Sequence, residues 1–483
     1  MTIKDLKPAI VWNNFYQLTR HPRPSKHEEK VRAFLLQWGK EHSIDTQLDD
    51  TGNVIMRIPA TPGYENRKTV ILQGHMDMVP QKVASSAHDF LNDPIETIVE
   101  GDWLTANGTT LGADNGLGVA LAMSVAESKD IQHGPIEVLV TYDEETGMTG
   151  AKSLKAGVLK GDILLNLDSE DEEELCIGCA GGLDAEAVFK YKTVRAKDMT
   201  AYRLSVKGLQ GGHSGMDISL YRANANKIAA NALVSVVEKK GVEIVKFTGG
   251  SLRNAIPFEA EVEFLVPKGK EKSVLAAVKG RLAASKDIYK ESDPAMEFIL
   301  EKAGTAVRFI EHEVALNLLK ALLACPSNVI RMSQSMKGLT ETSINMAIVR
   351  TENGKILVHS LMRSAIDEAK AELAEKVRFI FEMAGAKVSF RGGYSGWKPN
   401  PESELIGMLN GIYTRKFGKS MNVMATHGGL ECAIMGANYP NWEMISIGPT
   451  IRYPHSPDER CYIPSVEKSW EFLKEILLQI PVK

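Results

Sequence analysis

The chain has 483 residues, of which 44% are hydrophobic and 24% are charged, the balance of an ordinary folded protein. A formal net charge of −4 gives no strong positive field that would favour nucleic acid or anionic membrane, and no apolar run reaches the roughly 20 residues that a membrane-spanning helix needs. The length exceeds what one compact core accommodates, so two or more domains are expected. The five cysteines are sparse and odd in number, which favours reduced thiols and a cytoplasmic protein.

The first part of the chain alternates strand and helix signals. Short β-branched or apolar runs predict strands, and apolar residues at helical spacing predict helices. The predicted helices are 26–38 and 116–128, and the predicted strands are 54–58, 69–72, 136–141 and 163–167. This alternation predicts an α/β domain with a mixed, mainly parallel sheet flanked by helices.

The pattern changes to α+β near residue 190 and changes back near residue 390. Two rounds of strands and helices fill this segment, which predicts an inserted domain of two lobes. The predicted strands are 201–206, 242–247, 260–266, 343–349 and 356–361, and the helices are 222–240, 270–284, 314–324 and 365–385. A final strand is predicted at 442–447. We therefore expect a discontinuous catalytic domain at 1–190 plus 391–483, and an inserted domain at 191–390.

Potential metal ligands follow three of the predicted strands. Ligands of open α/β sheets bind beyond the carboxyl ends of the strands. His75 follows the strand at 69–72, and Asp77 comes two residues later, where its carboxylate can orient the imidazole. Asp168 follows the strand at 163–167. Taken alone, the pair of His75 and Asp77 also fits a simple surface turn.

Three further acids stand at turns. Asp114 lies in a glycine-rich turn before a helix, where it can bridge two cations or serve as a helix N-cap. Glu144 and Glu145 are adjacent after the strand at 136–141. Neighbours on an extended chain point to opposite sides, so we expect one to ligate metal and the other to act as general base. A solvated acidic turn is the alternative for this pair.

His455, after the strand at 442–447, supplies a final candidate ligand. Together the candidates form a two-metal set in which one carboxylate bridges. Its members are His75, Asp114, Glu145, Asp168 and His455. Nitrogen and oxygen ligands without thiolate suit zinc, cobalt or manganese. Two such ions activate water and polarise a carbonyl group, so the set predicts a hydrolase.

Three of these segments resemble the metal motifs of a known family. GHMDMVP at 74–80, GADNG at 112–116 and DEETG at 143–147 resemble those of the aminoacylase, dipeptidase and glutamate-carboxypeptidase family of di-zinc exopeptidases. Further segments, in order along nearly the whole chain, resemble its aminoacyl-histidine dipeptidase branch. They are PRPSK at 22–26, LDSED at 167–171, GCAGG at 178–182, GGHSG at 211–215, GLTETS at 338–343, GWKP at 396–399 and HGGLEC at 427–432.

The resemblance implies roles for the metal-site residues. One zinc ion would be held by His75, Asp114 and Asp168. The other would be held by Asp114, Glu145 and His455. Glu144 would be the general base, and Asp77 the orienting partner of the first histidine.

The resemblance also implies that the inserted domain is a lid that forms a homodimer. His213 would stabilise the oxyanion, either in its own subunit or across the dimer, and Asn254, Arg363 and Gly429 would bind the substrate backbone or its carboxylate. Arg363 equally suits a structural salt bridge.

The expected activity is metal-dependent hydrolysis of unblocked dipeptides, including Xaa-His, without a nucleic-acid or membrane partner. One alternative is an N-acyl amino-acid deacylase on the same scaffold. The other is a catalytically silent metal-binding scaffold.

Overall fold

The structure is a computed structural model that describes residues 1–483 and divides into two units. The first consists of Met1–Gly178, Pro399–Ala425 and Leu430–Lys483, and the second of Cys179–Lys398 and Thr426–Gly429. None of the helices combines the length and the apolar character needed to span a bilayer.

An eight-stranded sheet runs through the first unit. Its strands, in spatial order, are β1 (Asp45–Leu48), β2 (Val54–Ile58), β6 (Ile136–Thr141), β3 (Val70–His75), β7 (Ile163–Asn166), β21 (Glu443–Ser446), β8 (Glu174–Cys179) and β20 (Asn422–Thr426). The central strands β6, β3, β7 and β21 are parallel, whereas β1, β2 and β8 add antiparallel pairs. Every residue of β3 and β6 is buried, which explains why most of their residues are apolar. The predicted mixed, mainly parallel sheet is confirmed.

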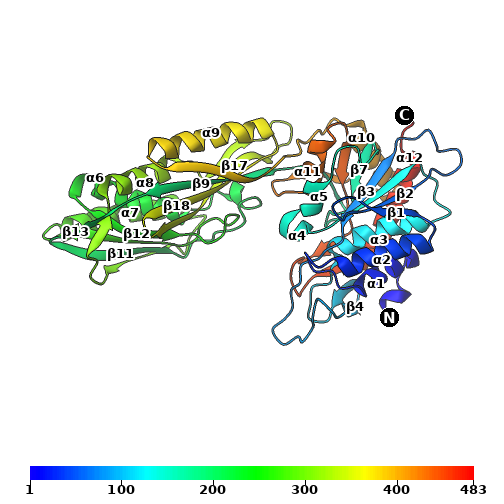
Figure 1. Ribbon diagram of the computed structural model, residues 1–483, viewed down its shortest axis with the longest axis horizontal. Coiled ribbons are helices and arrows are strands. Elements are labelled where there is room, and N and C mark those ends of the chain that lie inside the picture. The colour runs from blue at the N-terminus through cyan, green and yellow to red at the C-terminus, as the bar shows by residue number, and fades with distance from the viewer. The chain divides into compact units, whose positions relative to one another are not determined.

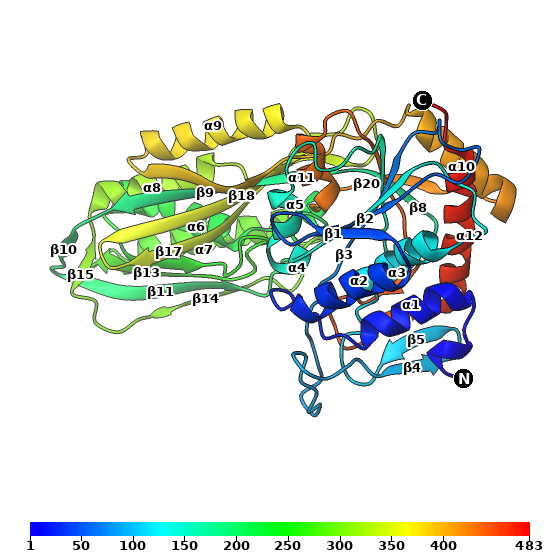
Figure 2. The same ribbon diagram turned by 45° about the vertical axis from the view of Figure 1, so that its right-hand side comes forward.

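Helices and a small second sheet complete the first unit (Figures 1 and 2). The helices are α1 (Ala9–Thr19), α2 (Glu29–Glu41), α3 (Ala113–Glu127), α4 (Glu144–Gly147), α5 (Thr149–Ser153), α10 (Glu404–Phe417), α11 (Glu431–Asn438) and α12 (Ile463–Gln479). The small sheet contains β22 (Ile451–Arg452), β23 (Arg460–Tyr462), β5 (Trp103–Ala106) and β4 (Thr97–Glu100). α3 is buried along nearly its whole length and packs between α1 and β3, so its start is held close to the end of that strand.

The second unit is built on one nine-stranded antiparallel sheet. Its main path contains β14 (Glu297–Lys302), β11 (Met199–Lys207), β13 (Ala260–Pro267), β12 (Glu243–Gly249), β17 (Thr340–Glu352), β18 (Lys355–Ser364), β9 (Gly181–Lys190) and β19 (Lys387–Tyr394), and β16 (Asn328–Met332) pairs with β17. β10 (Thr193–Arg195) and β15 (Arg308–Ile310) form a separate ribbon.

Four helices cover one face of this sheet (Figure 1). They are α6 (Ala225–Lys240), α7 (Glu271–Ile288), α8 (His312–Ala324) and α9 (Asp367–Met383). Alternate strand residues such as Leu204 and Val262 join the helices in a single apolar core. The residues between them face away, and Arg203 there forms a 2.8 Å ion pair with Glu263 on the neighbouring strand.

Two details of the inserted segment differ from the sequence prediction. Both α+β rounds contribute strands to the same sheet, because β12 pairs with β17, so the unit has one core rather than two lobes. In addition, β9 and β19 belong to this sheet. The unit therefore begins before residue 191 and ends after residue 390.

Candidate metal centre

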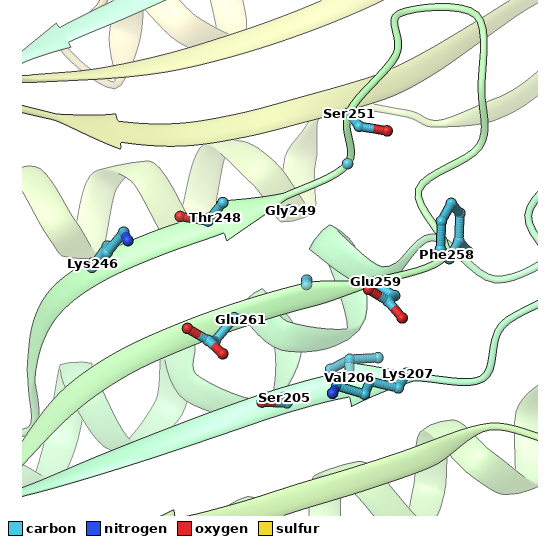
Figure 3. A pocket seen from close by; sticks show the side chains of 12 residues that line it. Ser205, Val206, Lys207, Lys246, Thr248, Gly249, Ser251, Phe258, Glu259 and Glu261 are labelled. Carbon is cyan, nitrogen blue, oxygen red and sulfur yellow. The ribbon is translucent and has the colours of Figure 1, made fainter. Parts of the chain in front are cut away.

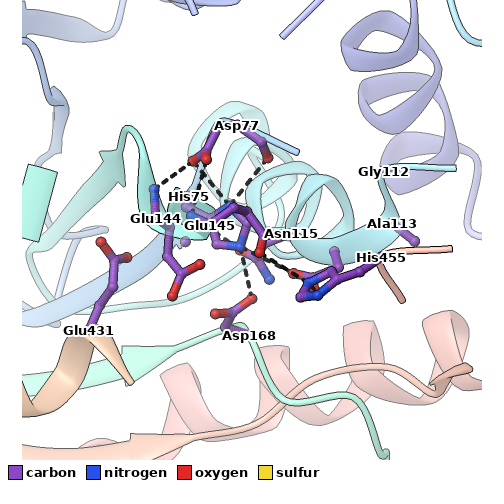
Figure 4. A network of polar contacts seen from close by, with 12 residues as sticks. His75, Asp77, Gly112, Ala113, Asn115, Glu144, Glu145, Asp168, Glu431 and His455 are labelled. Carbon is purple, nitrogen blue, oxygen red and sulfur yellow. Dashed lines mark hydrogen bonds and ion pairs between the residues drawn. The ribbon is translucent and has the colours of Figure 1, made fainter. Parts of the chain in front are cut away.

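Three neighbouring parallel strands end at the same edge of the eight-stranded sheet. β6, β3 and β7 lie side by side, and His75, the last residue of β3, is in register with Thr141, the last residue of β6. Asp168 lies just beyond β7, and Glu144 and Glu145 begin α4 just beyond β6. The side chains after these strands therefore meet at one place (Figure 4).

The first ligand cluster consists of His75, Asp114 and Asp168. The Nε2 atom of His75 lies 3.1 Å from Oδ1 of Asp114 and 3.5 Å from Oδ1 of Asp168. His75 is only 1% exposed, so its imidazole is held inside the fold and faces the two carboxylates.

The second cluster consists of Asp114, Glu145 and His455. The Nε2 atom of His455 lies 3.2 Å from Oδ2 of Asp114 and 3.0 Å from Oε2 of Glu145. Asp114 thus turns one carboxylate oxygen toward each of the two histidines. This is the arrangement expected of a carboxylate that bridges two cations.

The donor atoms of these clusters fit divalent metal ions. In each cluster they lie within 4.8 Å of one another. Two buried carboxylate oxygens, Oε1 of Glu145 and Oδ1 of Asp168, have no hydrogen-bond partner in the protein. Buried carboxylates without partners are unfavourable unless a cation pairs with them. Imidazole and carboxylate donors without thiolate are the ligands of zinc, cobalt or manganese.

The pKa shifts in the two clusters also support the binding of divalent metal ions. Burial raises the pKa of Asp168 to about 7; the charge of His75 opposes this shift, and those of Asp114 and Glu145 add to it. Hydrogen bonds to Asp114 and Glu145 raise the pKa of His455 to about 11. Both shifts reflect acids crowded together on a buried surface. Bound cations would balance this charge and keep the carboxylates ionised.

Asp77 connects the first histidine to the acidic pair. Its Oδ1 lies 3.4 Å from Nδ1 of His75 and accepts the backbone N–H of Glu144 at 3.0 Å. Its Oδ2 accepts the N–H of Glu145 at 3.2 Å and the hydroxyl of Ser25 at 2.8 Å. Burial alone would raise the pKa of Asp77, but these hydrogen bonds and the charge of His75 lower it to about 2.

Glu144 and Glu145 do not lie on an extended chain, so the expectation that they point to opposite sides is wrong. Asp143 adopts a left-handed conformation with φ of 52° and turns the chain from β6 into the helical turn α4. Both carboxylates approach His75 and form a third group with it. Burial raises the pKa of Glu144 well above its usual range, which suits a proton acceptor more basic than a carboxylate in water.

Glu459, for which the sequence predicts no role, holds the backbone at Asp114. This carboxylate is 2% exposed. One oxygen accepts the N–H groups of Leu111 at 2.8 Å and Gly112 at 3.1 Å, and the other accepts those of Ala113 at 2.8 Å and Asp114 at 3.3 Å. The start of α3 is therefore anchored to the segment that also carries the second metal-site histidine.

Arg23 supports the same turn from the other side. Its Nη1 donates to the carbonyl oxygens of Met76 and Asp77, both at 3.0 Å, and its Nη2 donates to the carbonyl oxygen of Gly112 at 2.5 Å. Both Arg23 and Glu459 bind backbone atoms, which sequence patterns do not reveal. Arg23 lies inside the PRPSK segment that resembles the family, whereas Glu459 lies in none of the segments that carry the resemblance.

The predicted lid residues all lie in the second unit. The Nδ1 atom of His213 accepts the backbone N–H groups of Gly215 at 3.3 Å and Met216 at 3.2 Å. The proton of the neutral ring is therefore on Nε2, which is left as a donor. Burial lowers the pKa of His213, and the charge of Arg363 lowers it further.

Arg363 and Gly429 are brought together around one tyrosine. Nη1 of Arg363 donates to the hydroxyl of Tyr394 at 3.4 Å, while its buried Nε has no hydrogen-bond partner. A Cβ atom at Gly429 would lie 3.0 Å from the Tyr394 ring, so a side chain there would crowd this group. Asn254 is exposed, and its carbonyl oxygen accepts the N–H of Ser214 at 2.8 Å.

The second unit also contains a cavity of 390 Å³ (Figure 3). It lies over β11, β12 and β13, and its lining includes Lys207, Lys246, Glu259 and Glu261. None of the predicted site residues lines it. Its mixed charges are those of the solvated sheet face described above.

A family model of peptidases matches residues 71–479, a span that contains every predicted metal ligand. The chain belongs to peptidase family M20/M25/M40. Within this family it is similar to the cytosol non-specific dipeptidase of Escherichia coli (strain K12). The two are 39% identical over 482 residues, which cover 100% of this chain and 99% of that protein.

Solved structures of other proteins share the fold of this chain. The crystal structure of aminoacylhistidine dipeptidase from Vibrio alginolyticus superposes with a TM-score of 0.95 at 42% identity, over 100% of this chain and 99% of that one. The aminopeptidase PepT from Bacillus cereus shares the fold alone, with a TM-score of 0.58 at 17% identity over 98% and 99% of the two chains. The predicted family and fold are therefore confirmed.

Proposed function

We propose that this M20 peptidase hydrolyses unblocked dipeptides, Xaa-His among them, at a centre of two divalent metal ions. The observation that carries the proposal is Asp114, whose two carboxylate oxygens face His75 and His455 separately. The high likeness to two dipeptidases over the whole chain supports the substrate class and a cytoplasmic setting.

The ligands divide into two sets that share one carboxylate. His75, Asp114 and Asp168 would hold one ion, and Asp114, Glu145 and His455 the other. Zinc suits these donors best, and cobalt or manganese can replace it. When bound, the ions supply an acidified water and polarise the scissile carbonyl group.

Glu144 acts as general base and then as general acid. Its carboxylate takes the proton of the attacking water and delivers it to the departing amine. Asp77 fixes the backbone of Glu144 and orients His75, so both groups are in place before substrate arrives. A base of raised pKa holds this proton well enough to pass it on.

The second unit would serve as a lid. The Nε2–H of His213 is available to donate to the developing oxyanion, because Nδ1 is engaged with backbone N–H groups. Arg363, Asn254 and Gly429 would bind the substrate backbone or its free carboxylate. The unpartnered Nε of Arg363 supports this role over a purely structural ion pair.

The first test is ninhydrin-detected release of histidine from Xaa-His dipeptides by metal-stripped and by zinc- or cobalt-reloaded protein. We expect metal-dependent release. A preference for N-acylated over free amino acids would favour the deacylase alternative, and metal binding without turnover of any amide would favour the silent scaffold.

A second proposal concerns assembly: the lid unit forms a homodimer in which His213 acts on the partner's site. Light scattering measures the mass, and subunit mixing tests the contact. His213→Ala and Glu144→Gln proteins, each inactive, should together regain about a quarter of wild-type activity, because half of the chains pair as heterodimers with one complete site each. No recovery in an exchanging dimer would contradict this.

A further inference from the structure

Glu431 is a buried acid for which the proposed mechanism has no use. It is the first residue of α11 and is 2% exposed. Its Oε2 accepts two hydrogen bonds, both of 2.6 Å, from Nε2 of Gln73 and from the hydroxyl of Thr141. Its Oε1 accepts none. Half of this carboxyl group is therefore anchored to β3 and β6, and the other half lacks a partner.

The surroundings of Glu431 are rich in negative charge. Burial raises the pKa of Glu431 to about 7, and Asp168 and Asp77 add to the shift against the opposing charge of His75. Among the buried acids beside the predicted ligands, Asp77 has hydrogen-bond partners for both of its carboxylate oxygens, whereas Oε1 of Glu431 has none. A group of this kind is stabilised by a ligand that brings a positive charge and an N–H donor.

The position of Glu431 indicates which part of a substrate it meets. Figure 4 shows its side chain rising from α11 beside that of Glu144, and the charge of Glu431 is among those that raise the pKa of Glu144. In the proposed mechanism, Glu144 takes the proton of the water that attacks the scissile carbonyl group. In a dipeptide the free amino group is two covalent bonds from that carbonyl carbon, so it lies close to any group that flanks the base.

We propose that Oε1 of Glu431 binds the free ammonium group of the dipeptide and thereby selects substrates with an unblocked amino terminus. The inference rests on the proposed dipeptidase function and deepens it. An N-acylated substrate offers no charge to the carboxylate and leaves Oε1 unpaired on a buried surface. A polar group built to meet a substrate N–H discriminates strongly against analogues that lack it.

A positioning role is the competing explanation. Gln73 and Thr141 each stand two residues before a segment of the metal centre, so Glu431 also braces the ends of β3 and β6. The two roles differ in one measurable respect. Bracing affects every substrate alike, whereas ammonium binding affects only substrates that carry an amino group.

The test compares alanyl-histidine with propionyl-histidine, which differs only by lacking the amino group. Glu431→Gln keeps an acceptor for Gln73 and Thr141 but loses the charge. We expect kcat/KM for alanyl-histidine to fall about 100-fold, mainly through KM, and that for propionyl-histidine to stay unchanged at its low wild-type value. The zinc content should match that of the wild type.

Two further variants complete the design. Glu431→Asp keeps the charge, and we expect it to retain part of the preference for alanyl-histidine, which covers the case of a poorly folding Gln variant. Glu137→Gln removes another buried glutamate, 4% exposed, on β6 and should leave the preference intact. Equal losses on both substrates, or no loss on either, would overturn the proposal. A wild-type enzyme that cleaves no dipeptide in any metal state would remove the proposed function itself.

Discussion

Asp77 holds Glu144 by its backbone: Oδ1 of the aspartate accepts the N–H of the glutamate at 3.0 Å. The same oxygen faces Nδ1 of His75 at 3.4 Å. One buried carboxylate therefore couples a candidate metal ligand at the end of β3 to the candidate base beyond β6. Disturbing Asp77 should affect metal binding and proton transfer together.

Replacing Asp77 by Asn tests this coupling. The amide has only one acceptor oxygen, so it cannot serve the imidazole and both backbone N–H groups at once. We expect zinc affinity to fall about 10- to 100-fold, as for other residues that orient metal ligands, and kcat to fall with it. Competition with a chelator measures the affinity. Ser25→Ala, which removes one hydrogen bond of 2.8 Å to Asp77, is the matched control and should change both values much less.

Replacing Glu144 by Gln separates metal binding from proton transfer. The amide cannot take a proton from water, so we expect kcat to fall about 10²- to 10⁴-fold. Metal content, measured by atomic emission, should stay at the wild-type level. Glu145→Gln is the comparison, since it should lower metal content as well. Wild-type turnover by the Glu144 variant would refute the general-base assignment.

The sequence predicted the elements that carry the site because their signals are local. The all-buried strands β3 and β6 are recognisable because most of their residues are apolar, and the candidate ligand His75 stands at the end of β3. The structure of the acidic pair was not predictable in this way, because the left-handed Asp143 converts a strand end into a helical turn. The residue at position 143 is aspartate rather than glycine, the residue that most readily adopts a left-handed conformation, so the turn had no signal in the sequence.

Long-range polar contacts also could not be predicted from the sequence. Glu459 meets the backbone at Asp114 across 345 positions, and Glu431 meets Gln73 across 358. Neither contact has a periodicity or a spacing that a pattern can reveal. The single sheet of the second unit was missed for a related reason, since the pairing of β12 with β17 joins two segments that look independent along the chain.

Glu459→Gln should destabilise the first unit and weaken metal binding. The amide nitrogen would face backbone N–H groups that now donate to a carboxylate oxygen, which leaves buried donors unsatisfied. We expect the free energy of unfolding to fall by about 1–3 kcal/mol in denaturant titrations of metal-free protein, and zinc affinity to fall because Asp114 loses its anchor. Asp458→Asn, at the exposed neighbouring position, should change stability by less than about 0.5 kcal/mol.

His427 should make the second unit sensitive to acid. It is 6% exposed, its Nε2 lies 2.7 Å from the Ser343 hydroxyl, and burial lowers its pKa to about 3, with the charge of Arg363 adding to the shift. In the unfolded chain the pKa is about 6.5, so between pH 6.5 and 3 the unfolded state binds more protons, and stability falls as the pH falls. We expect the free energy of unfolding to drop by about 2 kcal/mol from this residue between pH 7 and pH 5. His427→Gln should lose that part of the pH dependence in denaturant titrations with chelator present, and an unchanged slope would show that the imidazole is protonated in the folded protein.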